Sequence, residues 1–130
     1  MTNLGLHVLL DLEGCPEELL SDVASIKTAL RKAAELAGAT IVGEAFHSFN
    51  PPGVSGVLLI AESHLSIHTW PTLGKATLDV YTCGEKFDAE AAADLLAQFL
   101  EADRQQRTEI PRGISTNELP VQHAQHIQHT

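Results

Sequence analysis

The stretch GVSGVLLIAESHLSIHTWP, residues 53–71, decides the fold because it joins two different strand patterns. Residues 54–61 are almost entirely apolar, which is typical of a strand that is buried on both faces. Residues 65–70 alternate apolar and polar side chains, which is typical of a strand with one exposed face. Between them lie Glu62 and Ser63, and no glycine, asparagine or proline marks a turn there. The sequence therefore places a carboxylate and a hydroxyl between two predicted strands.

One helix is predicted before this stretch and one after it. Apolar residues recur with a period of 3.6 over residues 17–37, where Pro16 suits the first turn and Gly38 suits the end. A second helix is predicted over residues 88–100, with Asp88 as its N-cap. The predicted strands cover residues 6–12, 40–49, 54–61, 65–70 and 76–82, with a short edge strand at 106–110.

This order of elements predicts the fold class α+β. Two amphipathic helices can cover one face of a mostly antiparallel sheet, which gives a two-layer sandwich. The chain offers no third helix for the other face, so we expect a symmetric dimer to cover it. A length of 130 residues indicates one domain, which we place at residues 1–110. Residues 111–130 are polar and rich in Gln and His, and we expect them to form a loose tail.

Composition excludes several classes of function. The formal net charge is −9 and no basic run exists, so neither a nucleic acid nor an anionic membrane surface is an expected partner. This charge would suit a cationic ligand, although solubility is the simpler explanation. The N-terminus lacks a basic leader and no apolar run reaches the length of a membrane span, so we expect a cytoplasmic protein. Two cysteines do not make a disulfide scaffold.

Histidines raise the question of a metal site, and we expect none. His64 and His68 would lie about 13 Å apart on one strand face, too far to share one ion. His123, His126 and His129 repeat every three residues in the tail, where a solvated segment is the simpler interpretation.

The residues alone leave the chemistry open. Cys83 follows a predicted strand and precedes a glycine, so it is either structural or a proton donor, whereas Cys15 is interpreted as structural. A hydrolase built on Ser63, His68 and Asp79 is the generic alternative, but no G-x-S-x-G elbow surrounds the serine.

Four segments in register resemble the bacterial S-adenosylmethionine decarboxylase proenzymes, a pyruvoyl-dependent family. The resemblance covers about residues 4–87, roughly two-thirds of the chain. It rests on LGLHVLLDLEGC (4–15), GATIVGEAFHSF (38–49), the opening stretch (53–71) and LDVYTCGE (78–85). A match of this length is far more specific than a short motif.

The resemblance implies that the chain cuts its own Glu62–Ser63 bond. The products would be a β chain, residues 1–62, and an α chain, residues 63–130, whose first residue becomes a pyruvoyl group. That ketone forms a Schiff base with the substrate amine and accepts electrons as carbon dioxide leaves. The cofactor is therefore expected to come from Ser63 itself. The resemblance also implies a two-layer sandwich that assembles as a dimer of αβ units.

Other roles carry over by position. His68 matches the base that acts during processing, Ser55 matches a serine that assists it, and Cys83 matches the thiol that returns a proton to the decarboxylated carbon. Phe49 matches an aromatic residue that stacks on adenine.

The sequence departs from the family pattern after Trp-Pro. Thr72 stands where the family usually has a glutamate that holds both ribose hydroxyls, and Leu73 stands where an aromatic residue often follows. A missing charged hydrogen bond of this kind costs about 1.5–3 kcal/mol. The substrate predicted from the resemblance is S-adenosylmethionine, which would feed polyamine synthesis. The alternatives are the same chemistry on L-arginine or L-ornithine, and a non-processing regulatory homologue.

Overall fold

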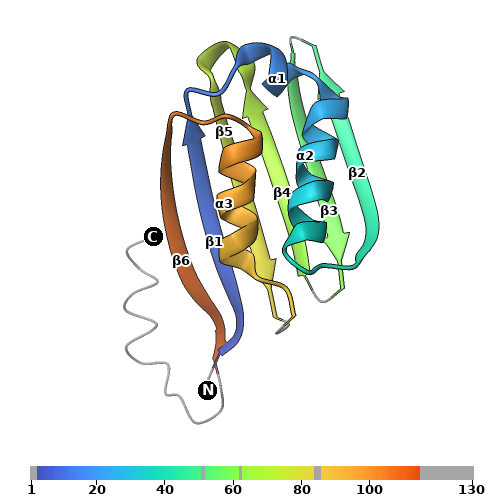
Figure 1. Cartoon of the computed structure of the whole chain (residues 1–130), viewed down its shortest axis with the longest axis vertical. Coiled ribbons are helices and arrows are strands. Elements are labelled where there is room, and N and C mark those ends of the chain that lie inside the picture. Colours follow the sequence, from blue (N-terminus) through green and yellow to red (C-terminus); the bar gives the residue numbers. More distant parts are fainter. Residues whose placement is uncertain (1–2, 51, 62, 84–85, 115–130) are drawn as a thin grey trace.

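The computed structural model describes residues 3–50, 52–61, 63–83 and 86–114, which form one sheet with helices on one side (Figure 1). The elements in chain order are β1 (Asn3–Glu13), α1 (Glu17–Ser21), α2 (Val23–Leu36), β2 (Ile41–Phe49), β3 (Gly53–Ile60), β4 (Ser63–Trp70), the 3-10 turn η1 (Pro71–Leu73), β5 (Lys75–Thr82), α3 (Ala89–Phe99) and β6 (Arg104–Ile114).

The six strands lie in the order β2-β3-β4-β5-β1-β6, and every neighbouring pair is antiparallel. The two strands of the opening stretch, β3 and β4, are therefore neighbours in the interior of the sheet. The first strand, β1, lies between β5 and β6, so a strand from the N-terminal half is enclosed by two from the C-terminal half.

A single apolar core fills the space between the sheet and the helices. On β4, Leu65 and Ile67 point into this core, whereas Ser66 between them points to the opposite side. The same alternation on β3 and β5 buries Leu58 and Val80. The predicted two-layer α+β fold is confirmed, because α2 packs against β2 and β3 while α3 packs against β5 and β1.

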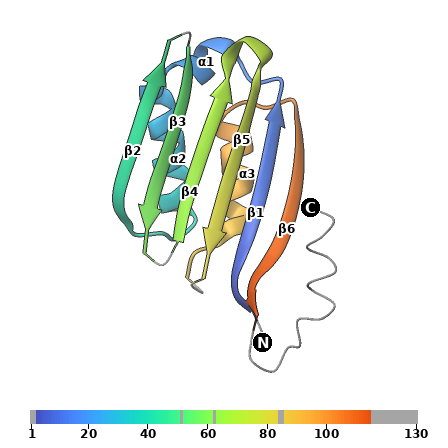
Figure 2. The same cartoon turned by 180° about the vertical axis from the view of Figure 1, so that it is seen from behind.

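The other side of the sheet, here called the open face, carries no described helix (Figure 2). It carries both polar and apolar side chains, and two of the apolar ones, Leu59 and Trp70, are 48% and 46% exposed. The side chains on the open face include those of His7, His47, Phe49, Ser55, Leu59, His64, Ser66, His68, Trp70, Asp79, Tyr81 and Arg112.

The prediction of one helix over residues 17–37 was wrong, because the chain forms two helices there. Asp22 takes an extended conformation, with φ −100° and ψ 106°, which ends α1 and precedes α2. Its carboxylate accepts a hydrogen bond from the Ser25 hydroxyl at 2.6 Å. The apolar period continues across one extended residue, so periodicity alone does not reveal the break. The predicted stop is confirmed, since Gly38 has φ +99°.

Both ends of the predicted strand 106–110 extend further than expected. β6 runs from Arg104 to Ile114 and pairs with β1 along its length. Pro111 is tolerated because β6 is an edge strand, where one side needs no amide donor. The strand therefore enters the predicted tail, while residues 115–130, with their three histidines, lie outside the described part of the chain.

Two further local features bear on the predictions. Asp88 caps α3 as expected, because its carboxylate accepts a hydrogen bond from the Ala91 amide at 3.1 Å. Within the described ranges, no helix combines the length and the apolar character that crossing a bilayer requires.

Candidate active site

Ser63 lies in the sheet rather than between strands, because β4 begins two residues earlier than predicted. It pairs with Ile60 of β3 and Thr82 of β5, and its side chain is half-buried on the helix side. The hydroxyl donates to Thr82 Oγ1 at 3.2 Å and lies 3.4 Å from the carbonyl oxygen of Ala61. Its neighbour Glu62 lies outside the described residues.

Cys83 lies beside this serine. It directly follows Thr82, the residue that both pairs with Ser63 and accepts its hydrogen bond, and it is exposed. One end of β4 and β5 therefore brings together the predicted cleavage serine and the predicted proton donor.

A second group of candidates lies at the other end of β4, on the open face. Ser55 of β3 lies directly opposite His68 of β4, and the distance from Ser55 Oγ to His68 Nδ1 is 2.7 Å. His47 of β2 lies opposite Ser55 on its other side, so three polar residues form a row across three strands. This row lines a hollow of about 350 Å³ that also includes Ser66.

Aromatic side chains flank that row. The Phe49 ring lies 4.5 Å from the His47 ring, and the Trp70 ring lies 6.4 Å from the His68 ring. Phe49 is 50% exposed, so its ring is available to a ligand. Thr72 is exposed in η1, which directly follows β4. All predicted substrate-binding residues thus gather at the His68 end of the strand.

The two groups are far apart within one chain. Ser63 and His68 are five positions apart on a strand that rises about 3.3 Å per residue, which separates them by about 17 Å. An odd number of positions also puts their side chains on opposite faces. The ends are visible in Figure 1, where β4 starts at the lower edge of the sheet and runs to η1 at the upper edge. His68 therefore cannot act on Ser63 of its own chain in this arrangement.

The hydrolase alternative is excluded by the same geometry. The Asp79 carboxylate contacts His7 Nε2 at 3.0 Å and accepts a hydrogen bond from the Ser66 hydroxyl at 2.8 Å. Ser63 contacts Thr82 instead, and His68 contacts Ser55. A nucleophile, base and orienting carboxylate must lie within hydrogen-bond reach of one another, and Ser63, His68 and Asp79 do not.

Cys15 behaves as a structural residue. It is 5% exposed in the core, and burial, followed by the negative charges of Asp103 and Glu101, raises the pKa of its thiol to about 11. The thiol therefore stays protonated near neutral pH and is a poor nucleophile. Among the residues that the structure describes, no three histidine, cysteine, aspartate or glutamate side chains gather as a metal site would require.

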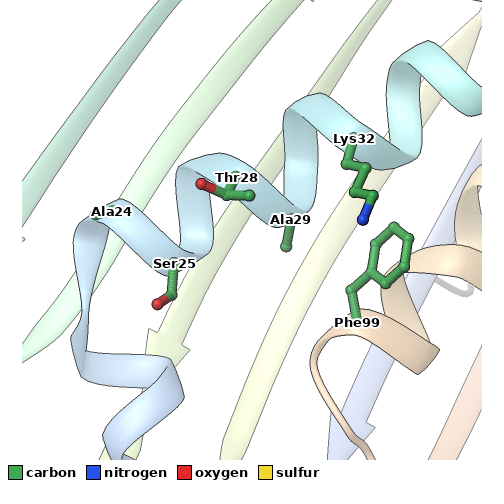
Figure 3. Close-up of a pocket in the computed structure, with 6 residues that line it drawn as sticks. All are labelled: Ala24, Ser25, Thr28, Ala29, Lys32 and Phe99. Carbon is green, nitrogen blue, oxygen red and sulfur yellow. The ribbon is translucent and has the colours of Figure 1, made fainter.

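A second hollow of about 350 Å³ lies between α2 and α3, on the side of the sheet opposite the open face (Figure 3). The Lys32 ammonium lies over the Phe99 ring, 5.4 Å from its centroid. The hollow is otherwise lined by small side chains of α2, namely Ala24, Ser25, Thr28 and Ala29. It contains none of the candidate catalytic residues.

Comparison with known proteins identifies the family. The family model described as S-adenosylmethionine decarboxylase matches residues 6–113. The chain belongs to the S-adenosylmethionine decarboxylase family. The family assignment made from the sequence is therefore confirmed.

Relatives within the family are similar over most of their length. A protein of Thermodesulfovibrio yellowstonii named S-adenosylmethionine decarboxylase proenzyme is 48% identical over 114 residues, which cover 88% of this chain and 84% of the relative. A proenzyme of the same name from Caldanaerobacter subterraneus is 44% identical over 121 residues, which cover 93% of this chain and 98% of the relative.

Solved structures support the same fold. The adenosylmethionine decarboxylase of Aquifex aeolicus superposes with a TM-score of 0.83 at 39% identity, covering 92% of this chain and 98% of that chain. A Trypanosoma brucei AdoMetDC structure superposes with a TM-score of 0.59 at 13% identity, covering 78% of this chain and 44% of that chain, which shows the fold alone.

The structure adds residues that the sequence analysis did not select. Thr82 contacts Ser63, and His47 lies beside Ser55. Both contacts join neighbouring strands, so they are set by the register of those strands. A register cannot be read until the partners of each strand are known. The alternation in residues 40–49 was the one available signal for His47, because it placed the histidine on the same face as Phe49.

Proposed function

We propose that this chain is a proenzyme that cuts itself between Glu62 and Ser63 and then decarboxylates S-adenosylmethionine. The observation that carries this proposal is the 48% identity to a protein named S-adenosylmethionine decarboxylase proenzyme. The place of Ser63 supports it, since the serine is the first residue after the connection between β3 and β4.

The processing reaction begins with an attack of Ser63 Oγ on the carbonyl carbon of Glu62. The peptide C–N bond breaks, and an ester replaces the amide. Loss of the Ser63 Hα and cleavage of the Cβ–Oγ bond then release the backbone carboxylate of Glu62 and leave a carbon–carbon double bond. Water adds as ammonia departs. The pyruvoyl group that remains supplies a ketone, which condenses with a substrate amine and takes up the electron pair released with carbon dioxide.

The fold suits such a cut. Residues 1–62 would retain β1, both N-terminal helices, β2 and β3, while residues 63–130 would retain β4, β5, α3 and β6. The pieces are interleaved, because β1 of the first pairs with β5 and β6 of the second. A break before Ser63 leaves the pairing of residues 64–70 with β3 and β5 in place, so the pyruvoyl end would stay beside Thr82.

We assign the remaining roles by position in the two groups. Cys83 would return the proton to the decarboxylated carbon, and its place next to Thr82 supports this role. His68 would act as the base during processing, and Ser55 would assist it through the 2.7 Å contact. Phe49 would stack on the adenine and Thr72 would approach the ribose, since both lie at the His68 end.

These roles require two chains. Because about 17 Å separates Ser63 from His68 in one chain, we infer that they meet across a dimer in which two open faces pack together. Ser63 is the first residue of β4, and in this dimer its side chain would turn from the helix side toward the interface. A two-fold axis between the sheets can bring the His68 end of one copy to the Ser63 end of the other. The exposed Leu59, Trp70 and Phe49 side chains supply apolar area for such an interface.

Decarboxylation assays on the purified chain test this function. We expect denaturing mass spectrometry to find two fragments that meet at Glu62 and Ser63, and we expect carbon dioxide release from S-adenosylmethionine. L-arginine and L-ornithine, assayed side by side, should release none. An intact chain after long incubation, or release from a basic amino acid alone, would refute the proposal.

A further inference from the structure

Thr69 is a buried polar residue whose hydroxyl ties three elements together. Its side chain is on the helix side of β4 and is 6% exposed. Oγ1 donates to the carbonyl oxygen of Leu20 in α1 at 2.9 Å and accepts from the amide of Val54 in β3 at 2.8 Å. The hydroxyl therefore acts as donor and acceptor at once, which only serine or threonine could reproduce at this size.

The first of these bonds is linked to the break between α1 and α2. Carbonyls in the last turn of a helix have no partner within it, and Leu20 is the penultimate residue of α1 because Asp22 is extended. Thr69 supplies a donor to that carbonyl from the sheet. The short helix α1 is thereby fixed over the end of β4, against β3 and η1.

The second bond lies next to the Ser55–His68 pair. Ser55 and His68 form the last pair of the β3–β4 ladder, and Val54 and Thr69 are the residues that adjoin them. At that position the two strands are joined by the Thr69 hydroxyl and the Val54 amide. A hydrogen bond to the Thr69 side chain thus holds together the end of the ladder that contains the Ser55–His68 pair.

We propose that Thr69 is a positioning residue that holds Ser55 and His68 in register from the buried side of the sheet. This inference rests on the proposed function, because it assigns the pair a part in processing. Without the Thr69 hydroxyl, the Val54 amide loses its hydrogen-bond acceptor, and the end of β3 separates from β4. Ser55 Oγ then moves out of hydrogen-bond reach of His68 Nδ1.

Three variants separate positioning from ordinary stability. Thr69→Val keeps the shape but removes both hydrogen bonds, Thr69→Ser keeps both, and Ile67→Val removes one buried methylene from the same strand without touching them. The processing rate of each is measured by denaturing mass spectrometry. We expect Thr69→Val to be slowed roughly tenfold or more. Thr69→Ser and Ile67→Val should stay within about threefold of the unchanged chain.

A second readout does not depend on the reaction. In chains made uncleavable by Ser63→Ala, the ¹⁵N resonances of the His68 imidazole report its contact with Ser55. We expect Thr69→Val to shift them as Ser55→Ala does, and Ile67→Val to leave them in place. If Thr69→Val does not fold, Thr69→Ala takes its place in both measurements.

The outcomes distinguish this inference from the proposed function. Slow processing of Thr69→Val, recovery in Thr69→Ser and shifted imidazole resonances support it. If His68→Ala processes at the normal rate, the role given to His68 fails, whatever Thr69 does. If His68→Ala blocks processing while Thr69→Val matches Ile67→Val in both readouts, the positioning role alone is overturned.

Discussion

Ser63 and His68 belong to the same strand but lie at its opposite ends and on opposite faces of the sheet. The Ser63 hydroxyl donates to Thr82 on the helix side, whereas the His68 imidazole contacts Ser55 on the open face. Strand geometry separates them by about 17 Å. A site that uses both residues therefore needs a second copy of the chain.

Mixing two inactive variants tests this arrangement. In a mixed dimer of Ser63→Ala and His68→Ala chains, one of the two shared sites contains both an intact Ser63 and an intact His68. We expect only the His68→Ala chain to be cut, because it alone still carries the serine. Denaturing mass spectrometry identifies the cut chain by its mass.

The matched control replaces the first partner by a chain with both substitutions, and no chain in that mixture should be cut. Cleavage of the His68→Ala chain by itself at the normal rate would contradict a base supplied by the partner. A mixture of the two single variants that forms dimers but stays intact would contradict it as well.

The two fragments should remain associated after processing. Strand β1 of the first fragment is enclosed between β5 and β6 of the second, and β3 pairs with β4 across the cut. We expect both fragments to elute together in native size-exclusion chromatography and to separate only in denaturant. Elution of residues 1–62 alone without denaturant would show that the sheet does not survive the cut.

Replacement of Cys83 should affect turnover rather than processing. Cys83→Ala removes the proposed proton donor, and loss of general acid catalysis typically costs a factor of about 10² or more. We expect fragments in normal yield with turnover reduced by about 100-fold. Cys15→Ala is the control, because that thiol is buried, and its turnover should stay within about threefold. A normal rate in Cys83→Ala would require another donor.

Thr72→Glu should strengthen binding of S-adenosylmethionine. A carboxylate can accept hydrogen bonds from both ribose hydroxyls, and a charged hydrogen bond contributes about 1.5–3 kcal/mol. We expect KM to fall by about one to two decades with little change in kcat. Thr72→Gln has the shape of the Glu variant without its charge, and its KM should lie between those of the unchanged chain and Thr72→Glu. An unchanged KM in Thr72→Glu would show that the ribose lies elsewhere.

Alkaline pH should destabilise the fold through Cys15. Its pKa is about 11 in the folded chain and 9.0 in the reference state, so the unfolded chain loses the thiol proton first. The contribution of Cys15 to the free energy of unfolding is therefore fully present below pH 9. It is lost between pH 9 and about 11, by at most about 3 kcal/mol. Urea unfolding at a series of pH values measures this loss. In Cys15→Ala, the free energy of unfolding should decline less between pH 9 and 11. An equally steep decline in that variant would show that other groups cause it.

Local patterns were sufficient for most elements of the fold. The alternation in residues 65–70 predicted which side chains of β4 are buried, and Asp88 predicted the start of α3, because both depend on neighbours close in sequence. The break at Asp22 escaped prediction, since a single extended residue does not change the apolar period. The hydroxyl that binds the end of α1, at Leu20, belongs to Thr69, which is 49 positions away. The full length of β6 escaped because its pairing with β1 depends on residues about 100 positions apart.

The sequence by itself determined the family and the candidate residues, because a long run of matching residues is specific without any knowledge of contacts. Only the tertiary structure decided how those residues group. Strand register places Cys83 near Ser63 and Ser55 against His68, and it keeps the two groups apart. The physical reason is that side chains meet across strands through backbone pairing, which links residues distant in sequence, while five positions along one extended strand separate residues that look adjacent in the sequence.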